Sequence, residues 1–275
     1  MRKFLEHEKS VFKVSPRHFI LMEITFLGTG TSTGVPLIGC HCSVCRSGDK
    51  RDRRLRAAIY VKTGDVAMVI DTGPDFRTQM LENQIERLDA ALITHSHKDH
   101  LAGLDDTKPF SWMNKKAFPI YGNKDSMDAI RNDFAYAFEK LRYPGIPTFE
   151  LHEIEKEPFT VNNTEVIPIP LLHYRMSVLG YRIGNMAYIT DASVIPDNSF
   201  PLLKNLDILI INALRKKTHI AHFSLDEALQ MVDAIAPKKA FLTHVGHDLG
   251  LYEEVSKALP ENVWLAYDGL KIDIV

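Results

Sequence analysis

The chain of 275 residues is 45% hydrophobic and 25% charged, which is typical of a globular protein large enough to bury a substantial core. Its formal net charge is −2, so no global basic field favours nucleic acid or an anionic membrane surface. No apolar run approaches the roughly 20 residues of a membrane span, and the N-terminus carries no clear secretory signal. We therefore expect a cytoplasmic protein with no membrane partner.

The first segments along the chain are an extension over residues 1–21 and a core strand that begins at Met22. The strand leads into GTGTSTG, residues 28–34. These glycines lack the spacing of a dinucleotide-binding loop, no helix follows them, and no Gly-Lys-Ser/Thr sequence is present. We therefore expect a tight loop that does not bind nucleotide phosphates.

All three cysteines of the chain come next, as Cys40, Cys42 and Cys45 in a C-x-C-x-x-C pattern. Their odd number excludes full internal pairing, and Cys40 and Cys42 are too close to form a disulfide without severe strain. The spacing points several thiolates at one centre. It therefore favours a metal-binding knuckle at residues 40–45 over a disulfide.

The remaining elements alternate between hairpins, helices and single strands. They are a hairpin over 58–63 and 66–71, a helix over 75–83, a strand over 90–94, a helical stretch over 126–138, short strands and loops over the proline-rich segment 144–170, a second hairpin over 179–183 and 186–190, a helix over 224–236 with a capping box, a strand over 239–243, a helix over 251–259 and closing strands over 263–275.

The order of hairpin, aspartate, helix and strand occurs twice, with the aspartates at positions 71 and 191. This repetition predicts two similar halves packed together, in one domain over residues 22–275. Because hairpins interrupt the alternation of strands and helices, the sheets should be mixed. We expect an α/β protein with a four-layer sandwich, in which helices cover two inner sheets.

The segment THSHKDH, residues 94–100, is the densest group of potential metal ligands in the sequence. His95 and His97 follow a buried strand and can project to one metal ion, whereas Asp99 and His100 lie one turn later and can project to a second. Four ligands within six residues are too many for a chance histidine-rich turn. The segment therefore predicts a dinuclear metal site.

This motif resembles the metallo-β-lactamase superfamily, whose hallmark is H-x-H-x-D-H, and the resemblance covers the chain from Met22 onward. Family members supply three further ligands at strand ends, and the candidates here are His173 in PLLHYR, Asp191 in YITDAS and His244 in FLTHVGH. The resemblance implies the four-layer αββα fold of that family and two divalent ions, zinc or manganese. One ion would be held by His95, His97 and His173, the other by Asp99, His100 and His244, with Asp191 bridging them.

The bridging aspartate and a charge count favour phosphodiester hydrolysis. Two divalent ions, less Asp99, Asp191 and a bridging hydroxide, leave one positive charge, which suits a phosphodiester monoanion. Two neighbouring ions can also stabilise the attacking and leaving oxygens of an in-line displacement. We expect a phosphoric diester hydrolase that uses a hydroxide bound to two metal ions. Its expected substrate is a small phosphodiester of a cyclic ribose or a nucleotide.

The leaving alkoxide needs a proton, and His222 is the expected general acid because a histidine of ordinary pKa suits neutral pH. Asp99 and His222 are thus the expected catalytic residues. His219, three residues earlier, is the rival for the acid, and a family motif of the H-F type favours His222. Asp71 is expected to orient metal ligands without binding metal itself.

The cysteine knuckle needs a fourth ligand for tetrahedral zinc, and the loop THVGH can supply His247 to the thiolates while it supplies His244 to the active site. This combination resembles the PhnP-type phosphodiesterases of the carbon–phosphorus lyase pathway. The matching segments are GTGTSTG, the cysteine cluster, DTGPDFR, THSHKDH, GLDD, HF and LTHVGH. A closed Cys3His site of this kind implies one structural zinc ion.

Several alternatives stay open at this point. A tRNA-processing endonuclease of the same fold would need a basic arm for RNA, so nucleic acid is not the expected partner. A thioesterase would leave the cysteine knuckle unexplained, and a non-enzymatic carrier of cofactor biosynthesis would not need the full ligand set. Arg175 and Arg215 are candidates for binding a second phosphate or for structural ion pairs. A homodimer is the default oligomeric state.

Overall fold

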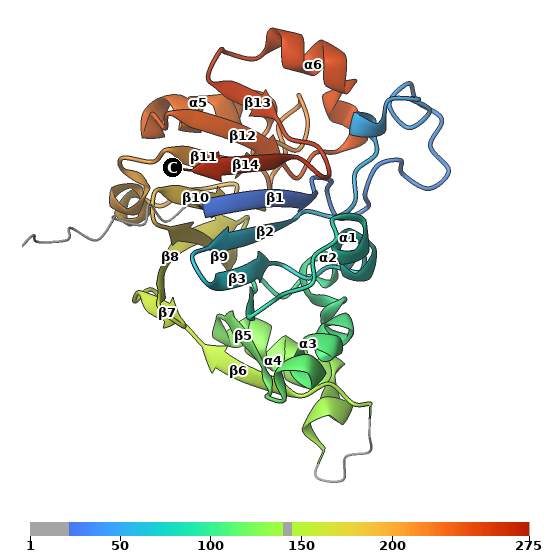
Figure 1. Cartoon of the computed structure of the whole chain (residues 1–275). Coiled ribbons are helices and arrows are strands. Elements are labelled where there is room, and N and C mark those ends of the chain that lie inside the picture. The colour runs from blue at the N-terminus through green and yellow to red at the C-terminus, as the bar shows by residue number, and fades with distance from the viewer. Residues whose placement is uncertain (1–21, 140–144, 275) are drawn as a thin grey trace, which may run out of the picture.

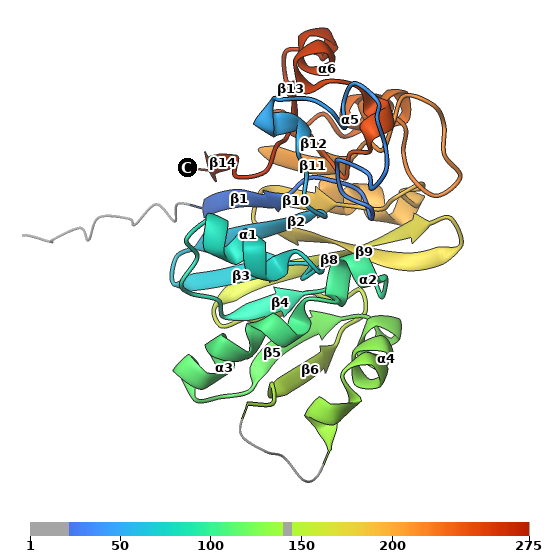
Figure 2. The ribbon, with the colours of Figure 1, turned by 90° about the vertical axis from the view of Figure 1, so that its right-hand side faces the viewer.

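A computed structural model describes residues 22–139 and 145–274, so the expected extension over residues 1–21 lies outside the described residues. Two seven-stranded sheets pack face to face, and helices cover their outer faces (Figure 1; Figure 2). Both sheets contain parallel and antiparallel pairs. The expected four-layer sandwich with mixed sheets is confirmed.

The first sheet is formed mainly by the N-terminal half, in the order β14-β1-β2-β3-β4-β5-β6. Its strands are β1 (Met22–Gly28), β2 (Ala58–Thr63), β3 (Val66–Ile70), β4 (Ala90–Leu92), β5 (Phe118–Gly122), β6 (Phe149–Glu153) and β14 (Lys271–Ile274). The β2–β3 hairpin is the one that the alternating pattern predicts. From β3 to β6 the neighbouring strands are parallel.

The second sheet repeats this plan, in the order β13-β12-β11-β10-β9-β8-β7. Its strands are β7 (Phe159–Val161), β8 (Thr164–His173), β9 (Met176–Ile183), β10 (Met186–Ile189), β11 (Ile208–Asn212), β12 (Lys239–Thr243) and β13 (Val263–Leu265). Antiparallel pairing of β8, β9 and β10 gives way to parallel pairing from β10 to β13. The two expected halves are therefore present.

The helices pack on the outer faces of the sheets (Figure 2). The α-helices are α1 (Phe76–Glu82), α2 (Lys98–Leu101), α3 (Lys108–Asn114), α4 (Lys124–Asp133), α5 (Leu225–Ile235) and α6 (Tyr252–Ala258). The short 3-10 helices are η1 (Lys50–Asp52), η2 (Leu104–Thr107), η3 (Ala135–Phe138), η4 (Asp197–Leu203) and η5 (His247–Leu249). Helix α5 begins with the expected capping box of Ser224 and Glu227.

Three apolar cores hold the layers together. One lies between the sheets and includes Ile24 and Met68 from the first sheet and Tyr188 and Ile210 from the second. The other two lie between each sheet and its helices. Because the central core joins strands of both halves, we infer that residues 22–274 form a single domain.

Four segments were not singled out by the sequence pattern: strands β5 and β11 and helices α2 and α3. Both strands are short apolar runs of five residues, too short to show a helical or strand period. Basic residues cluster between Lys50 and Arg56, and one of them lies in the interior. Arg54 is buried, and its guanidinium donates hydrogen bonds to Thr29 Oγ1 and to the carbonyl of Ala266.

The carboxyl ends of the central strands meet at one edge of the sandwich. Asp71 follows β3, Asp191 follows β10 and His244 follows β12, and all three have positive φ angles of 68°, 55° and 54°. Such conformations are uncommon outside glycine and concentrate at functional sites. Each strand thus turns sharply at the residue that carries a candidate site side chain.

Candidate active site

Two candidate metal-binding groups lie side by side at this edge. In the first, His95, His97 and His173 each place one ring nitrogen so that the three atoms lie within 4.8 Å of one another. His95 and His97 come from the loop after β4, and His173 ends β8. The closest pair is His95 Nε2 and His97 Nδ1, at 3.0 Å.

The second group contains Asp99, His100, Asp191 and His244, again with one ligand atom each within 4.8 Å. His100 Nε2 lies 3.0 Å from Asp99 Oδ2 and 3.2 Å from Asp191 Oδ2. His244 Nε2 lies 3.1 Å from Asp191 Oδ1. Asp99 and His100 belong to α2, whose first turn brings both toward the same point.

Asp191 also belongs to a third group, with His173 and His222. His173 is a member of the first group, so Asp191 lies between the two candidate metal positions. Its Oδ2 accepts a hydrogen bond from the hydroxyl of Thr190, at 2.7 Å. One Asp191 oxygen therefore lies near His173 of the first group, and the carboxylate also contacts His100 and His244 of the second.

Buried partners outside these groups fix the orientation of three imidazoles. His100 Nδ1 lies 2.7 Å from Asp71 Oδ2, and Asp71 also accepts hydrogen bonds from the backbone and hydroxyl of Thr94. His173 Nδ1 donates to the carbonyl of Ala221, at 2.7 Å. His95 Nδ1 lies 3.0 Å from Thr94 Oγ1. In each case the other ring nitrogen is left for a metal ion, which is how metal-binding histidines are commonly held.

The site fits cations for a reason visible in the structure itself. Among the described residues, His100 Nε2 and His244 Nε2 are buried without a hydrogen-bond partner of good geometry, although both face carboxylates. Burial opposes the charged form of His244, but the neighbouring Asp191 outweighs it and raises the pKa of His244 to about 9. Divalent cations at this point would displace such protons and accept the lone pairs. Imidazole and carboxylate donors suit zinc and manganese alike.

His222 lies beside the metal groups, but one expectation about it is wrong. Its Nδ1 lies 3.6 Å from Asp191 Oδ1, and its ring stacks on that of His244 with centroids 4.9 Å apart. Burial and the charge of His244 lower the pKa of His222 to about 3. The ordinary histidine pKa expected from sequence does not apply, because the ring is largely buried among other imidazoles.

The rival His219 lies farther out. Its ring centroid is 5.1 Å from that of His222, and its Nδ1 accepts a hydrogen bond from the backbone of Ala221. Of the two arginines considered for a second phosphate, Arg215 donates to the carbonyls of Lys217 and Thr218 and thus braces its own loop. Arg175 lies over the ring of Tyr174, with 5.1 Å from its guanidinium carbon to the ring centroid.

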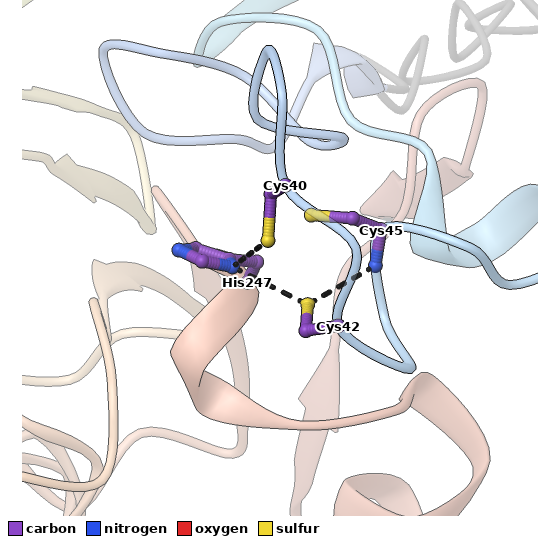
Figure 3. Close-up of side chains that lie close together, drawn as sticks. All are labelled: Cys40, Cys42, Cys45 and His247. Carbon is purple, nitrogen blue, oxygen red and sulfur yellow. Dashed lines mark hydrogen bonds between the residues drawn. The ribbon is translucent and has the colours of Figure 1, made fainter.

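The cysteine knuckle forms a separate cluster near the surface. Figure 3 shows Cys40, Cys42, Cys45 and His247 pointing toward one common centre from two segments far apart in sequence. His247 Nδ1 lies 3.4 Å from the sulfur atoms of both Cys40 and Cys42. Ligands of a tetrahedral zinc ion are separated by about 3.4–3.8 Å, so these four side chains fit a closed zinc site.

Several residues that shape the site could not be identified from the sequence. The carbonyl of Ala221 orients His173, and a backbone group leaves no trace in side-chain patterns. Thr94 and Thr190 contact site residues through their hydroxyls. Each directly precedes a candidate ligand, which is the only sequence feature that could have drawn attention to them.

Comparison with known protein families gives one match that covers most of the chain. The model of the beta-lactamase superfamily domain matches residues 67–245. This range contains THSHKDH, His173, Asp191, His222 and His244.

Among curated proteins, the chain is similar to an octanoyltransferase of Porphyromonas gingivalis. The two are 40% identical over 253 residues, which cover 91% of this chain and 51% of that protein. The chain thus spans about half the length of this relative. It is also 26% identical to a ribonuclease Z of Nostoc sp. over 167 residues, which cover 59% of this chain and 46% of that protein.

Among solved structures, the chain is similar to a diphosphatase of the PhnP family. The TM-score is 0.87 at 39% sequence identity, and the match covers 93% of this chain and 98% of that one. The resemblance to PhnP-type proteins noted in the sequence is therefore confirmed at the level of the whole fold.

Proposed function

The chain belongs to the beta-lactamase superfamily, and we propose that it is a metal-dependent hydrolase whose substrate is a small phosphodiester. The position of Asp191 carries this proposal. Its carboxylate is shared between the group of His173 and the group of His100 and His244, so it suits a pair of closely spaced cations. A dinuclear centre of this kind carries a positive charge that suits a phosphodiester monoanion. It can also stabilise both the attacking and the leaving oxygen of an in-line displacement.

We assign the ligands as the two groups described above. His95, His97 and His173 would hold one divalent ion and Asp99, His100 and His244 the other, with Asp191 between them. When bound, the two ions supply Lewis acidity to the phosphoryl oxygens and lower the pKa of water. Cys40, Cys42, Cys45 and His247 would hold one structural zinc ion.

His222 is placed to hold a proton at the leaving oxygen. Its ring contacts those of His173 and His244, with centroids 4.6 Å and 4.9 Å apart, so it borders both metal groups. The ring is neutral in the free protein because burial lowers its pKa to about 3. An anionic substrate against the ring favours its protonated form, so His222 would act as an acid only when the site is filled.

Two other activities are supported less well. The octanoyltransferase relative is about twice as long as this chain, and covalent acyl transfer needs a nucleophile such as a thiol or an amine. Among the described residues, the site is built from imidazoles and carboxylates, and the cysteines belong to the knuckle. RNA processing would need an extended basic surface, whereas the net charge of the chain is −2.

The test compares three substrates with zinc-loaded and manganese-loaded protein. Bis(p-nitrophenyl) phosphate is expected to be hydrolysed, with p-nitrophenyl phosphate and octanoyl-coenzyme A at least about 100-fold slower. On a further diester with an alkoxide leaving group, adenosine 2′,3′-cyclic monophosphate, His222→Ala should lower kcat by about 100-fold or more, as expected for a general acid, while His219→Ala should stay within about threefold. If the protein hydrolysed the thioester faster than the diester, the proposal would be wrong.

A further inference from the structure

The turn between β8 and β9 exposes an aromatic ring at the residue that follows a candidate metal ligand. Tyr174 follows His173 in the chain, and 46% of its surface is exposed. Its φ angle is 55°, in the left-handed region. This conformation is unfavourable for a bulky residue and recurs at binding sites, where the surroundings hold it in place.

The turn is held by the segment that follows Asp191. The backbone N–H of Tyr174 donates to Ser193 Oγ at 2.9 Å, and that hydroxyl donates to the carbonyl of Leu172 at 3.2 Å. The N–H groups of Ser193 and Val194 donate to the same carbonyl. The backbone of the turn that carries Tyr174 is therefore held by the segment that follows Asp191.

Further exposed apolar side chains lie on the two segments that contact the strand end that carries His173. Val194 is 45% exposed, on the segment that holds the turn, and Ile220 is 69% exposed. Ile220 precedes Ala221, whose carbonyl accepts the hydrogen bond from His173 Nδ1. Arg175 lies over the Tyr174 ring, and among the described residues it has no acidic partner. An aromatic ring, two aliphatic side chains and a cation thus lie exposed on the segments that carry or contact His173.

We propose that Tyr174 is a stacking platform for the nucleobase of a nucleotide substrate, with Val194 and Ile220 against the adjoining sugar. The proposal rests on the proposed phosphodiesterase function and narrows its substrate class. A flat ring that bears a cation on one face suits a planar base on the other, because bases stack readily on tyrosine and on arginine. A long acyl chain would instead need an enclosed apolar groove.

The test uses two diesters with the same leaving group. Thymidine 5′-(p-nitrophenyl phosphate) and methyl p-nitrophenyl phosphate both release p-nitrophenolate, so their difference isolates the nucleoside. With metal-loaded wild type, we expect kcat/KM to favour the thymidine ester by about tenfold or more, mainly through KM. Tyr174→Ala should remove most of that preference and leave the methyl ester within about twofold, whereas Tyr174→Phe should retain it.

A matched control is Trp112→Ala, which removes a 54% exposed aromatic ring from α3. This variant should change kcat/KM for neither substrate. A measurement without turnover supports the kinetics: adenosine 5′-monophosphate should inhibit the wild type at least about fivefold more tightly than ribose 5-phosphate, and Tyr174→Ala should abolish this difference.

Four results overturn the stacking proposal. These are equal wild-type rates on the two esters, an equal loss on both in Tyr174→Ala, equal inhibition by the two monophosphates, and a preference for long RNA that persists in Tyr174→Ala. Failure of the wild type to hydrolyse either ester would instead overturn the proposed function itself.

Discussion

Asp71 Oδ2 lies 2.7 Å from His100 Nδ1, and both side chains are almost completely buried. The carboxylate also accepts the N–H of Thr94 at 2.9 Å. It therefore ties the end of β3 to the loop after β4 and turns His100 Nε2 toward Asp99 and Asp191. Gly73 allows this close approach, because a Cβ there would lie 2.1 Å from the carbonyl of Asp99.

The first prediction concerns this pair. Asp71→Asn should lower the affinity of the protein for its more weakly held active-site ion by about 10- to 100-fold, the usual cost of losing an outer partner of a metal-binding histidine. Competition with a chelator, followed by metal analysis, measures the affinity. Asp128→Asn, an exposed carboxylate on α4, is the matched control. Unchanged affinity in Asp71→Asn would show that the pair does not orient His100.

The second prediction concerns the knuckle. Cys42→Ser should lose one equivalent of zinc and destabilise the protein by several kcal/mol, on the order of 3 or more, because zinc binding contributes directly to folding free energy. His244 and His247 are separated by two residues, and Val245 pairs with the loop after β1. The variant should therefore also bind its active-site ions less tightly.

The control for the knuckle is His41→Ala. His41 lies between Cys40 and Cys42, is exposed, and is not a member of the four-residue group. The His41→Ala variant should keep the full zinc content and the wild-type melting temperature. Retention of zinc by Cys42→Ser, or equal loss in both variants, would contradict the assigned knuckle.

The third prediction is a pH dependence that arises from Asp268, which is not a member of the metal-binding groups. Burial raises the pKa of Asp268 to about 6, although it accepts hydrogen bonds from the backbone of Leu55 and the hydroxyl of Thr29. The folded protein therefore binds this proton more tightly than the unfolded chain. The stability that results is fully present below about pH 4 and is lost as the pH rises through about 6.

Urea unfolding of the wild type and of Asp268→Asn measures this effect. From about pH 5 to about pH 7.5 the unfolding free energy of the wild type should fall by about 1 kcal/mol relative to the variant. A difference between the two proteins that does not change with pH would contradict the raised pKa of Asp268.

The sequence predicted the sandwich because its signals are local. The β2–β3 and β9–β10 hairpins alternate clearly around turn residues, and the capping box of Ser224 marks the start of α5. THSHKDH is equally local, since its four ligand candidates lie in one loop and one helical turn. What the sequence could not reveal depends on burial and on backbone geometry. The low pKa of His222 arises from its neighbours in space, and Tyr174 is distinguished by a φ angle and an exposure that no residue pattern encodes.

The metal content and the diesterase rate of Asp191→Asn, measured beside the wild type, decide whether this carboxylate joins two metal ions. A dinuclear site bridged by this carboxylate predicts two active-site ions in the wild type, at most one in the variant, and a fall in kcat on bis(p-nitrophenyl) phosphate of at least about 1,000-fold. The variant should keep its structural zinc and its fold. Two active-site ions and near wild-type turnover in Asp191→Asn would contradict the account.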